Sequence, residues 1–168
     1  MVGVLFFVLL TYLGWELYLL TVVTLSCLGV WAADRAELYF GRKDDGRIVI
    51  DEVAGQLWTL LPLVFLIPLP SLGIRPLEHN MADTGFWAWV ALVVTAFVVF
   101  RVLDIWKPGP VGWAERKFAG GLGVMADDVV AGVIGAVVVT LPCYASVLYQ
   151  LHALETAGLL DVLRWATA

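Results

Sequence analysis

The stretch FWAWVALVVTAFVVFRVLDIW at residues 86–106 decides the fold class. No charged residue occurs between its start and Arg101, and a transmembrane helix needs about 20 mainly apolar residues. Tryptophans stand near both ends, at Trp87 and Trp106, where an aromatic belt at the membrane surface would lie. The stretch therefore predicts a helix that spans a membrane.

Similar apolar blocks occupy much of the remaining chain, at 2–13, 15–33, 53–70 and 128–150. The first would be only about 18 Å long as a helix, short of a hydrocarbon core of about 30 Å. Gly14 separates it from the second block, so we expect these two to form a helical hairpin. The sequence predicts an all-α, polytopic membrane bundle with this N-terminal hairpin and three further transmembrane helices, in a single domain over 1–168.

The composition agrees with a membrane protein and excludes other classes. The 168 residues are 61% hydrophobic and 15% charged, whereas soluble domains are roughly 45–50% apolar and about 25% charged. A soluble globular enzyme, a disordered tail and a nucleic-acid-binding module are thereby excluded. Cys27 and Cys143 both fall within apolar blocks, which predicts two buried packing residues rather than a disulfide framework.

The loop charges predict the orientation of the helices. Lys and Arg favour the cytoplasmic side of short loops. Loops 34–52 and 107–127 hold most of the cations, whereas loop 71–85 has only Arg75. We therefore expect the first two loops to face the cytoplasm.

With that topology, acidic residues gather at the cytoplasmic boundary. A carboxylate inside the apolar zone costs about 2.5–3.5 kcal/mol on insertion scales, so such residues indicate function. Carboxylates beside a few cations suit a hard cation such as Mg²⁺, which takes oxygen ligands and binds substrate phosphate, while Lys and Arg hold the remaining phosphate charge. The residues at this boundary are Asp34, Asp51, Glu52, Asp104, Asp127 and Asp128.

Each of these groups also has a purely structural interpretation. Arg101, Asp104 and Lys107 are spaced by three residues and could form an ion-pair ladder on one helix face. Asp127 and Asp128 could cap the helix that follows them. The glycines of GGLGVMA at 120–126 would let backbone amides approach an anion, but they lack the spacing of a known phosphate-binding fingerprint.

Several phosphatase chemistries lack the residues that they need. Neither cysteine has an arginine six positions on, and no D-x-D-x-T stretch occurs. The two histidines, His79 and His152, are expected away from the charged face. Metal-assisted attack by water remains.

Three stretches, IVIDEVAGQ at 48–56, FRVLDIWKPGPVGWAERKF at 100–118 and GGLGVMADDVVAG at 120–132, resemble the signatures of the phosphatidylglycerophosphatase A family. The resemblance runs from about residue 2 to about residue 150. It implies a bacterial inner-membrane enzyme of phospholipid biosynthesis, facing the cytoplasm, that requires Mg²⁺ and converts phosphatidylglycerophosphate to phosphatidylglycerol and phosphate. Family members usually begin with a further Gly-, Ser- and Pro-rich segment, which we expect to be absent here.

Matching the motifs residue by residue implies a set of site residues. The expected Mg²⁺ ligands are Asp51, Glu52, Asp104, Asp127 and Asp128. Arg101 and Lys107 are expected to bind the substrate phosphate. Catalytic roles fall on Glu52, Asp104 and Asp128, with Glu52 a candidate to accept the proton of the attacking water.

Two rival functions stay open at this stage. One is a Mg²⁺-dependent membrane transferase acting on a diphosphate or CDP-lipid, although DDVVA at 127–131 lacks the further aspartate of a D-D-x-x-D pattern. The other is a small transporter or scaffold, which predicts acidic residues deep within the spans rather than at one boundary.

Overall fold

The computed structural model describes residues 2–11, 14–41, 46–66 and 82–156, and these residues form six helices. The all-α class predicted from the sequence is confirmed. The helices are α1 (Val2–Leu10), α2 (Trp15–Phe40), α3 (Ile50–Leu66), α4 (Ala82–Trp106), α5 (Pro110–Lys117) and α6 (Gly120–Thr156).

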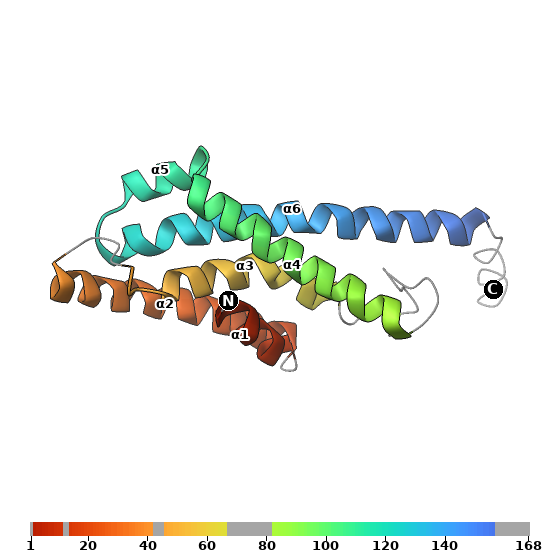
Figure 1. The fold of residues 1–168 in the computed structure, drawn as a ribbon, viewed down its shortest axis with the longest axis horizontal. Helices are drawn as coiled ribbons and strands as arrows, with labels where there is room; N and C mark the ends of the chain where they lie inside the picture. The colour runs from red at the N-terminus through yellow and green to blue at the C-terminus, as the bar shows by residue number, and fades with distance from the viewer. Residues whose placement is uncertain (1, 12–13, 42–45, 67–81, 157–168) are drawn as a thin grey trace.

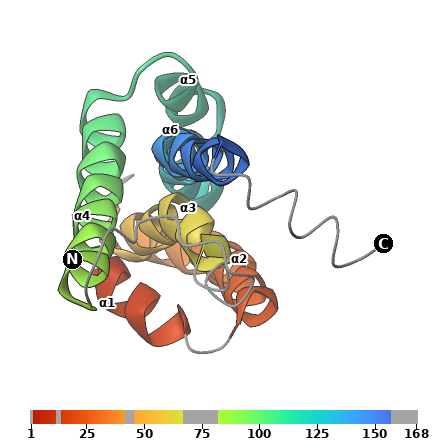
Figure 2. The same cartoon turned by 90° about the vertical axis from the view of Figure 1, so that its right-hand side faces the viewer.

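Helix α3 lies in the middle of the bundle, with α1, α2, α4 and α6 around it (Figures 1 and 2). Its most extensive contact is with α6. Glycines allow this approach, as is common where helices pack within membranes. A Cβ added at Gly55 would meet the Phe100 ring and the carbonyl of Asp128, and one at Gly135 would lie 2.9 Å from Thr59. The first half of α3 therefore packs closely against residues 128–135 of α6.

Aromatic side chains fix the short α1 to the bundle. The Phe7 ring is fully buried, and its centroid lies 6.0 Å from that of Tyr18 and 6.1 Å from that of Trp89. The Tyr18 hydroxyl donates a hydrogen bond of 2.8 Å to the carbonyl of Leu57. The predicted break at Gly14 is present, but α1 packs chiefly against α3 rather than along α2 as a simple hairpin would.

Among the described residues, three helices are long and apolar enough to cross a membrane, over Trp15–Phe40, Trp89–Trp106 and Gly120–Leu141. The predicted total of a hairpin and three further spans is not confirmed. Helix α1 has only 9 residues, and α3 has 17. Residues 67–70, which complete the block predicted at 53–70, lie outside the described residues.

The structure corrects two expected helix boundaries and the expected burial of one cysteine. Helix α2 continues to Phe40, so Asp34 lies in a helix rather than in a loop. The predicted loop 107–127 contains α5 and the start of α6. Cys27 is exposed on α2 instead of buried, because it lies on the side of the helix that faces away from the bundle. The side chain of Cys143 lies outside the described part of the structure.

Candidate active site

Three aspartates are buried at one end of the bundle, where α3 and α6 begin. Asp51, Asp127 and Asp128 have exposed fractions of 6%, 5% and 4%. Asp51 lies in the first turn of α3, where the positive end of the helix dipole favours a carboxylate. Asp127 and Asp128 lie about two turns inside α6 rather than at its first residue, so the interpretation as helix caps is wrong.

Asp128 is at the centre of this acidic group. It interacts electrostatically with Asp104, Asp51 and Asp127, and it is within hydrogen-bond reach of Asp104. Four carboxylates from α3, α4 and α6 are thus neighbours, and the predicted convergence is present in the structure. Asp34, also predicted at this boundary, is not part of the acidic group. Its carboxylate accepts a hydrogen bond from the backbone N–H of Gly121 and so caps α6.

Arg101 connects α4 to α3. Its Nη1 atom lies 2.8 Å from Oε1 of Glu52 and 3.0 Å from Oδ2 of Asp104. The pair of Arg101 and Asp104 is one of the two ion pairs in the ladder that the sequence predicts on this helix. The guanidinium thus contacts two carboxylates at the edge of the acidic group, and the Arg101 side chain is a third exposed, which leaves it accessible to a ligand.

Lys107 does not continue this ladder. Helix α4 ends at Trp106, and the chain turns away at Lys107. Lys107 has a positive φ of 47°, a backbone conformation that residues other than glycine rarely adopt. Its ammonium lies 2.7 Å from Oδ2 of Asp127 and 2.8 Å from Oε1 of Glu115. The sequence pattern had placed Lys107 on the face of Asp104, and the strained backbone redirects it to α6.

The partners of Lys107 keep it charged. Burial alone lowers the pKa of the ammonium group, but the hydrogen bonds to Asp127 and Glu115, and the charges of both carboxylates, outweigh burial and raise the pKa above its usual value. Glu115 lies on α5, within the segment 107–127 that the sequence predicts to be a loop. Pro110 at the first position of α5 is a helix-start signal that would have revealed this helix.

The glycine run that could have bound a phosphate instead packs against α2. A Cβ added at Gly121 would meet the backbone carbonyl of Val30, and the N–H of Gly121 is occupied by Asp34. Gly120 has a φ of 64° and begins α6. The Gly121 amide is therefore taken by the Asp34 carboxylate of α2 and is not available to a phosphate, which contradicts the interpretation of this run as an anion-binding loop.

The donor atoms of the acidic group fit a hard divalent cation in chemical type. All are carboxylate oxygens, and Oδ1 of Asp127 is buried without a hydrogen-bond partner among the described residues. Within the same residues, no three His, Cys, Asp or Glu side chains are already arranged as metal ligands. Arg101 and Lys107 occupy some of the oxygens, so the predicted Mg²⁺ ligand set stays a prediction.

These features define a class: an integral membrane protein with a buried acidic site, bordered by two cations, at one end of an apolar helical bundle. The family model for phosphatidylglycerophosphatase A matches residues 1–142. The chain belongs to the phosphatidylglycerophosphatase A family. The family name denotes a phosphatase, which favours the first interpretation of the sequence over the transferase.

The relatives agree with this assignment. The chain is 40% identical to phosphatidylglycerophosphatase A of Escherichia coli over 131 residues, which are 78% of this chain and 63% of the relative. It is 37% identical over 120 residues to a Bacteroides thetaiotaomicron protein named as a proposed phosphatidylinositol-3-phosphatase, covering 71% of this chain and 62% of the relative.

A third relative is phosphatidylglycerophosphatase A of Haemophilus influenzae, which is 30% identical over 132 residues, or 79% of this chain and 68% of the relative. The chain thus spans less than two thirds of the length of the first two relatives. No solved structure matches it.

Proposed function

We propose that this protein hydrolyses the terminal phosphate monoester of phosphatidylglycerophosphate, releasing phosphatidylglycerol and inorganic phosphate. The observation that carries the proposal is the group of four neighbouring carboxylates, three of them buried, beside two cations at one end of the bundle. The names of the E. coli and H. influenzae relatives supply the lipid. We further propose that this end faces the cytoplasm of a bacterial inner membrane and that residues 1–168 act as one domain.

The acidic group is proposed to bind Mg²⁺. A bound Mg²⁺ would polarise the phosphate and lower the pKa of a water molecule, and so supply a nucleophile at neutral pH. The unpartnered, buried Oδ1 of Asp127 supports this proposal, because an unsatisfied buried carboxylate oxygen is costly unless a cation binds it. The proposed ligands are Asp51, Glu52, Asp104, Asp127 and Asp128.

Arg101 and Lys107 are proposed to bind the phosphate of the substrate. Each already contacts two carboxylates, so each can exchange a carboxylate for a phosphate oxygen when a metal ion neutralises the acidic group. Because of its pKa, Lys107 would present a charged ammonium throughout the neutral range. The guanidinium can bind two phosphate oxygens at once, which would orient the monoester.

The reaction then requires one proton transfer from water. The water oxygen forms a bond to phosphorus, the bond between phosphorus and the glycerol oxygen breaks, and the leaving oxygen takes up a proton. Where the other four carboxylates hold the metal, Glu52 is proposed to accept the proton of the water, because its carboxylate is half-exposed and would lie beside a phosphate bound by Arg101. Asp104 and Asp128, which are neighbours, would complete the catalytic group.

The test is phosphate release from phosphatidylglycerophosphate in mixed micelles by the purified protein, first with Mg²⁺ and then with EDTA. We expect release that requires the metal and is lost in Asp104→Asn. Glu16→Gln is the matched control, since it makes the same kind of change in the first turn of α2, away from the acidic group, and should retain activity. Wild-type turnover in Asp104→Asn would refute the site assignment, and no turnover by the wild type would refute the function.

A further inference from the structure

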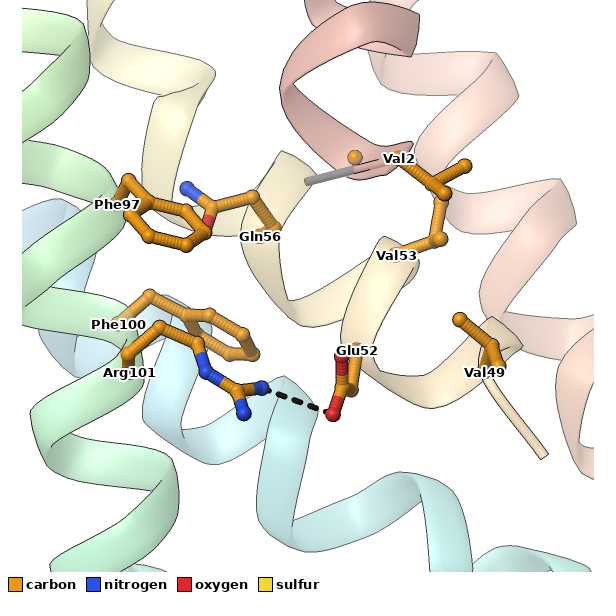
Figure 3. Close-up of a pocket in the computed structure, with 9 residues that line it drawn as sticks. Val2, Val49, Glu52, Val53, Gln56, Phe97, Phe100 and Arg101 are labelled. Carbon is orange, nitrogen blue, oxygen red and sulfur yellow. Dashed lines mark ion pairs between the residues drawn. The ribbon is translucent and has the colours of Figure 1, made fainter. Parts of the chain in front are cut away.

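A cavity of about 220 Å³ lies beside the acidic group, between α1, α3 and α4. Its walls are mainly apolar, and Val2, Val53 and Phe97 are among the residues that form them (Figure 3). Its polar residues are Glu52, Arg101 and Gln56. The volume is several times the roughly 30 Å³ of one water molecule, so the cavity can hold a small organic group.

Gln56 is an anomaly in this cavity. The residue is only 3% exposed, and neither its amide nitrogen nor its amide oxygen has a hydrogen-bond partner among the residues that the structure describes. Buried amides are nearly always hydrogen-bonded, because an unsatisfied one is destabilising. The start of α1 also packs closely against the base of this side chain, since a Cβ added at Gly3 would lie 2.9 Å from the Cβ of Gln56. A buried, unsatisfied amide in a cavity indicates a missing polar ligand.

The cavity connects Gln56 to the proposed phosphate site. Glu52 and Gln56 are about one turn apart on α3, about 6 Å along the helix, and both extend toward α4 (Figure 3). The Arg101 guanidinium lines the same cavity and contacts Glu52. A phosphate monoester bound by Arg101 would therefore have its next atoms beside Gln56.

We propose that Gln56 recognises a free hydroxyl group on the carbon next to the phosphate-bearing carbon of the substrate. A hydroxyl can accept a hydrogen bond from the amide nitrogen and donate one to the amide oxygen, so it satisfies both atoms, whereas an ester offers only acceptors. The inference rests on the proposed phosphatase function and adds a specificity-determining residue to it.

This chemistry separates lipid phosphates into two groups. Phosphatidylglycerophosphate and phosphatidylinositol 3-phosphate both have a hydroxyl beside the phosphate, which matches the names of all three relatives. Phosphatidic acid has an esterified oxygen at that position. The site is therefore expected to prefer lipid phosphates that have this free hydroxyl. The preference should hold whether phosphatidylglycerophosphate or phosphatidylinositol 3-phosphate is the natural substrate.

The test compares two substrates in wild type and in Gln56→Met, which replaces the amide by an apolar side chain of similar shape. The substrates are phosphatidylglycerophosphate and its analogue with CH₂ in place of the hydroxyl-bearing carbon. For the wild type we expect kcat/KM to be about 10- to 100-fold lower with the analogue, since a buried polar group is then left unpaired. In Gln56→Met the two substrates should differ by less than about threefold.

Phosphatidylinositol 3-phosphate and phosphatidic acid serve as further substrates, and Gln56→Leu as a second variant. Thr95→Val is the control for loss of a polar group, because Thr95 is exposed on α4 and its hydroxyl donates a hydrogen bond to the carbonyl of Ala91 in the same helix. Equal hydrolysis of the two substrates by the wild type, or undiminished selectivity in both Gln56 variants, would overturn the inference while leaving the phosphatase function intact. If the wild type hydrolyses none of the four lipids, the proposed function itself fails, and the inference with it.

Discussion

Lys107→Met tests whether the ion pair with Asp127 behaves as a buried one. The Asp127 side chain is 7% exposed and that of Lys107 is 25% exposed. Removing one partner of a fully buried pair costs about 3–5 kcal/mol, because the other charge is left without compensation. Since Lys107 retains some contact with water, we expect a loss of about 2–3 kcal/mol in the free energy of unfolding.

Two further variants separate this effect from a general loss of charge. Glu115 contacts the same ammonium but is 39% exposed, so Glu115→Gln should cost no more than about 1 kcal/mol. Adding Asp127→Asn to Lys107→Met removes the orphaned charge and should restore about 1–2 kcal/mol.

The assay is equilibrium unfolding in mixed micelles with increasing dodecyl sulfate, followed by the fluorescence of the eight tryptophans. Equal losses in Lys107→Met and Glu115→Gln would refute the assignment of Lys107–Asp127 as the buried pair. So would a double variant that is less stable than Lys107→Met.

Two other outcomes follow from the packing and the charges. Gly121→Ala should lower the free energy of unfolding by about 1–3 kcal/mol, because its Cβ would overlap the Val30 carbonyl, while Gly46→Ala, whose added Cβ would meet no atom of the described residues, should be neutral in the same assay. The raised pKa of Lys107 means that its ion pairs contribute fully below the unfolded value of about 10.4 and are lost only above its higher folded value. Wild type and Lys107→Arg should therefore have parallel stability curves from pH 7 to 9, and curves that diverge there would contradict this.

The parts of the site that depend on periodic apolar sequence could be predicted. The run that ends in Asp104 predicts a membrane helix because about 20 apolar residues have few other stable locations. Once the helices and their orientation are assigned, Asp51, Asp104 and Asp128 must reach the same boundary. Their proximity is therefore a consequence of topology, and the structure contains it.

The missed parts depend on contacts between helices. Gly120 and Gly121 look like a loop in the sequence, yet they begin α6. Glycine is needed at these positions because α2 approaches too closely for a Cβ. Lys107 pairs with α6 because a positive φ ends the ladder, which periodicity does not reveal. Gln56 ends a signature stretch of the sequence, but only the structure, in which α1 and α4 enclose it, shows that its amide has no hydrogen-bond partner among the described residues.

The unbroken length of α6 sets the depth of the site in a bilayer. Its 37 residues extend about 55 Å, well beyond a hydrocarbon core of about 30 Å. Asp127 lies only about 10 Å from the start of this helix, so its carboxylate can sit at the level of the lipid headgroups while the rest of α6 crosses the core. A lipid would then reach the carboxylates by lateral diffusion, without being lifted from its leaflet. Turnover would follow the mole fraction of substrate in the membrane rather than its bulk concentration.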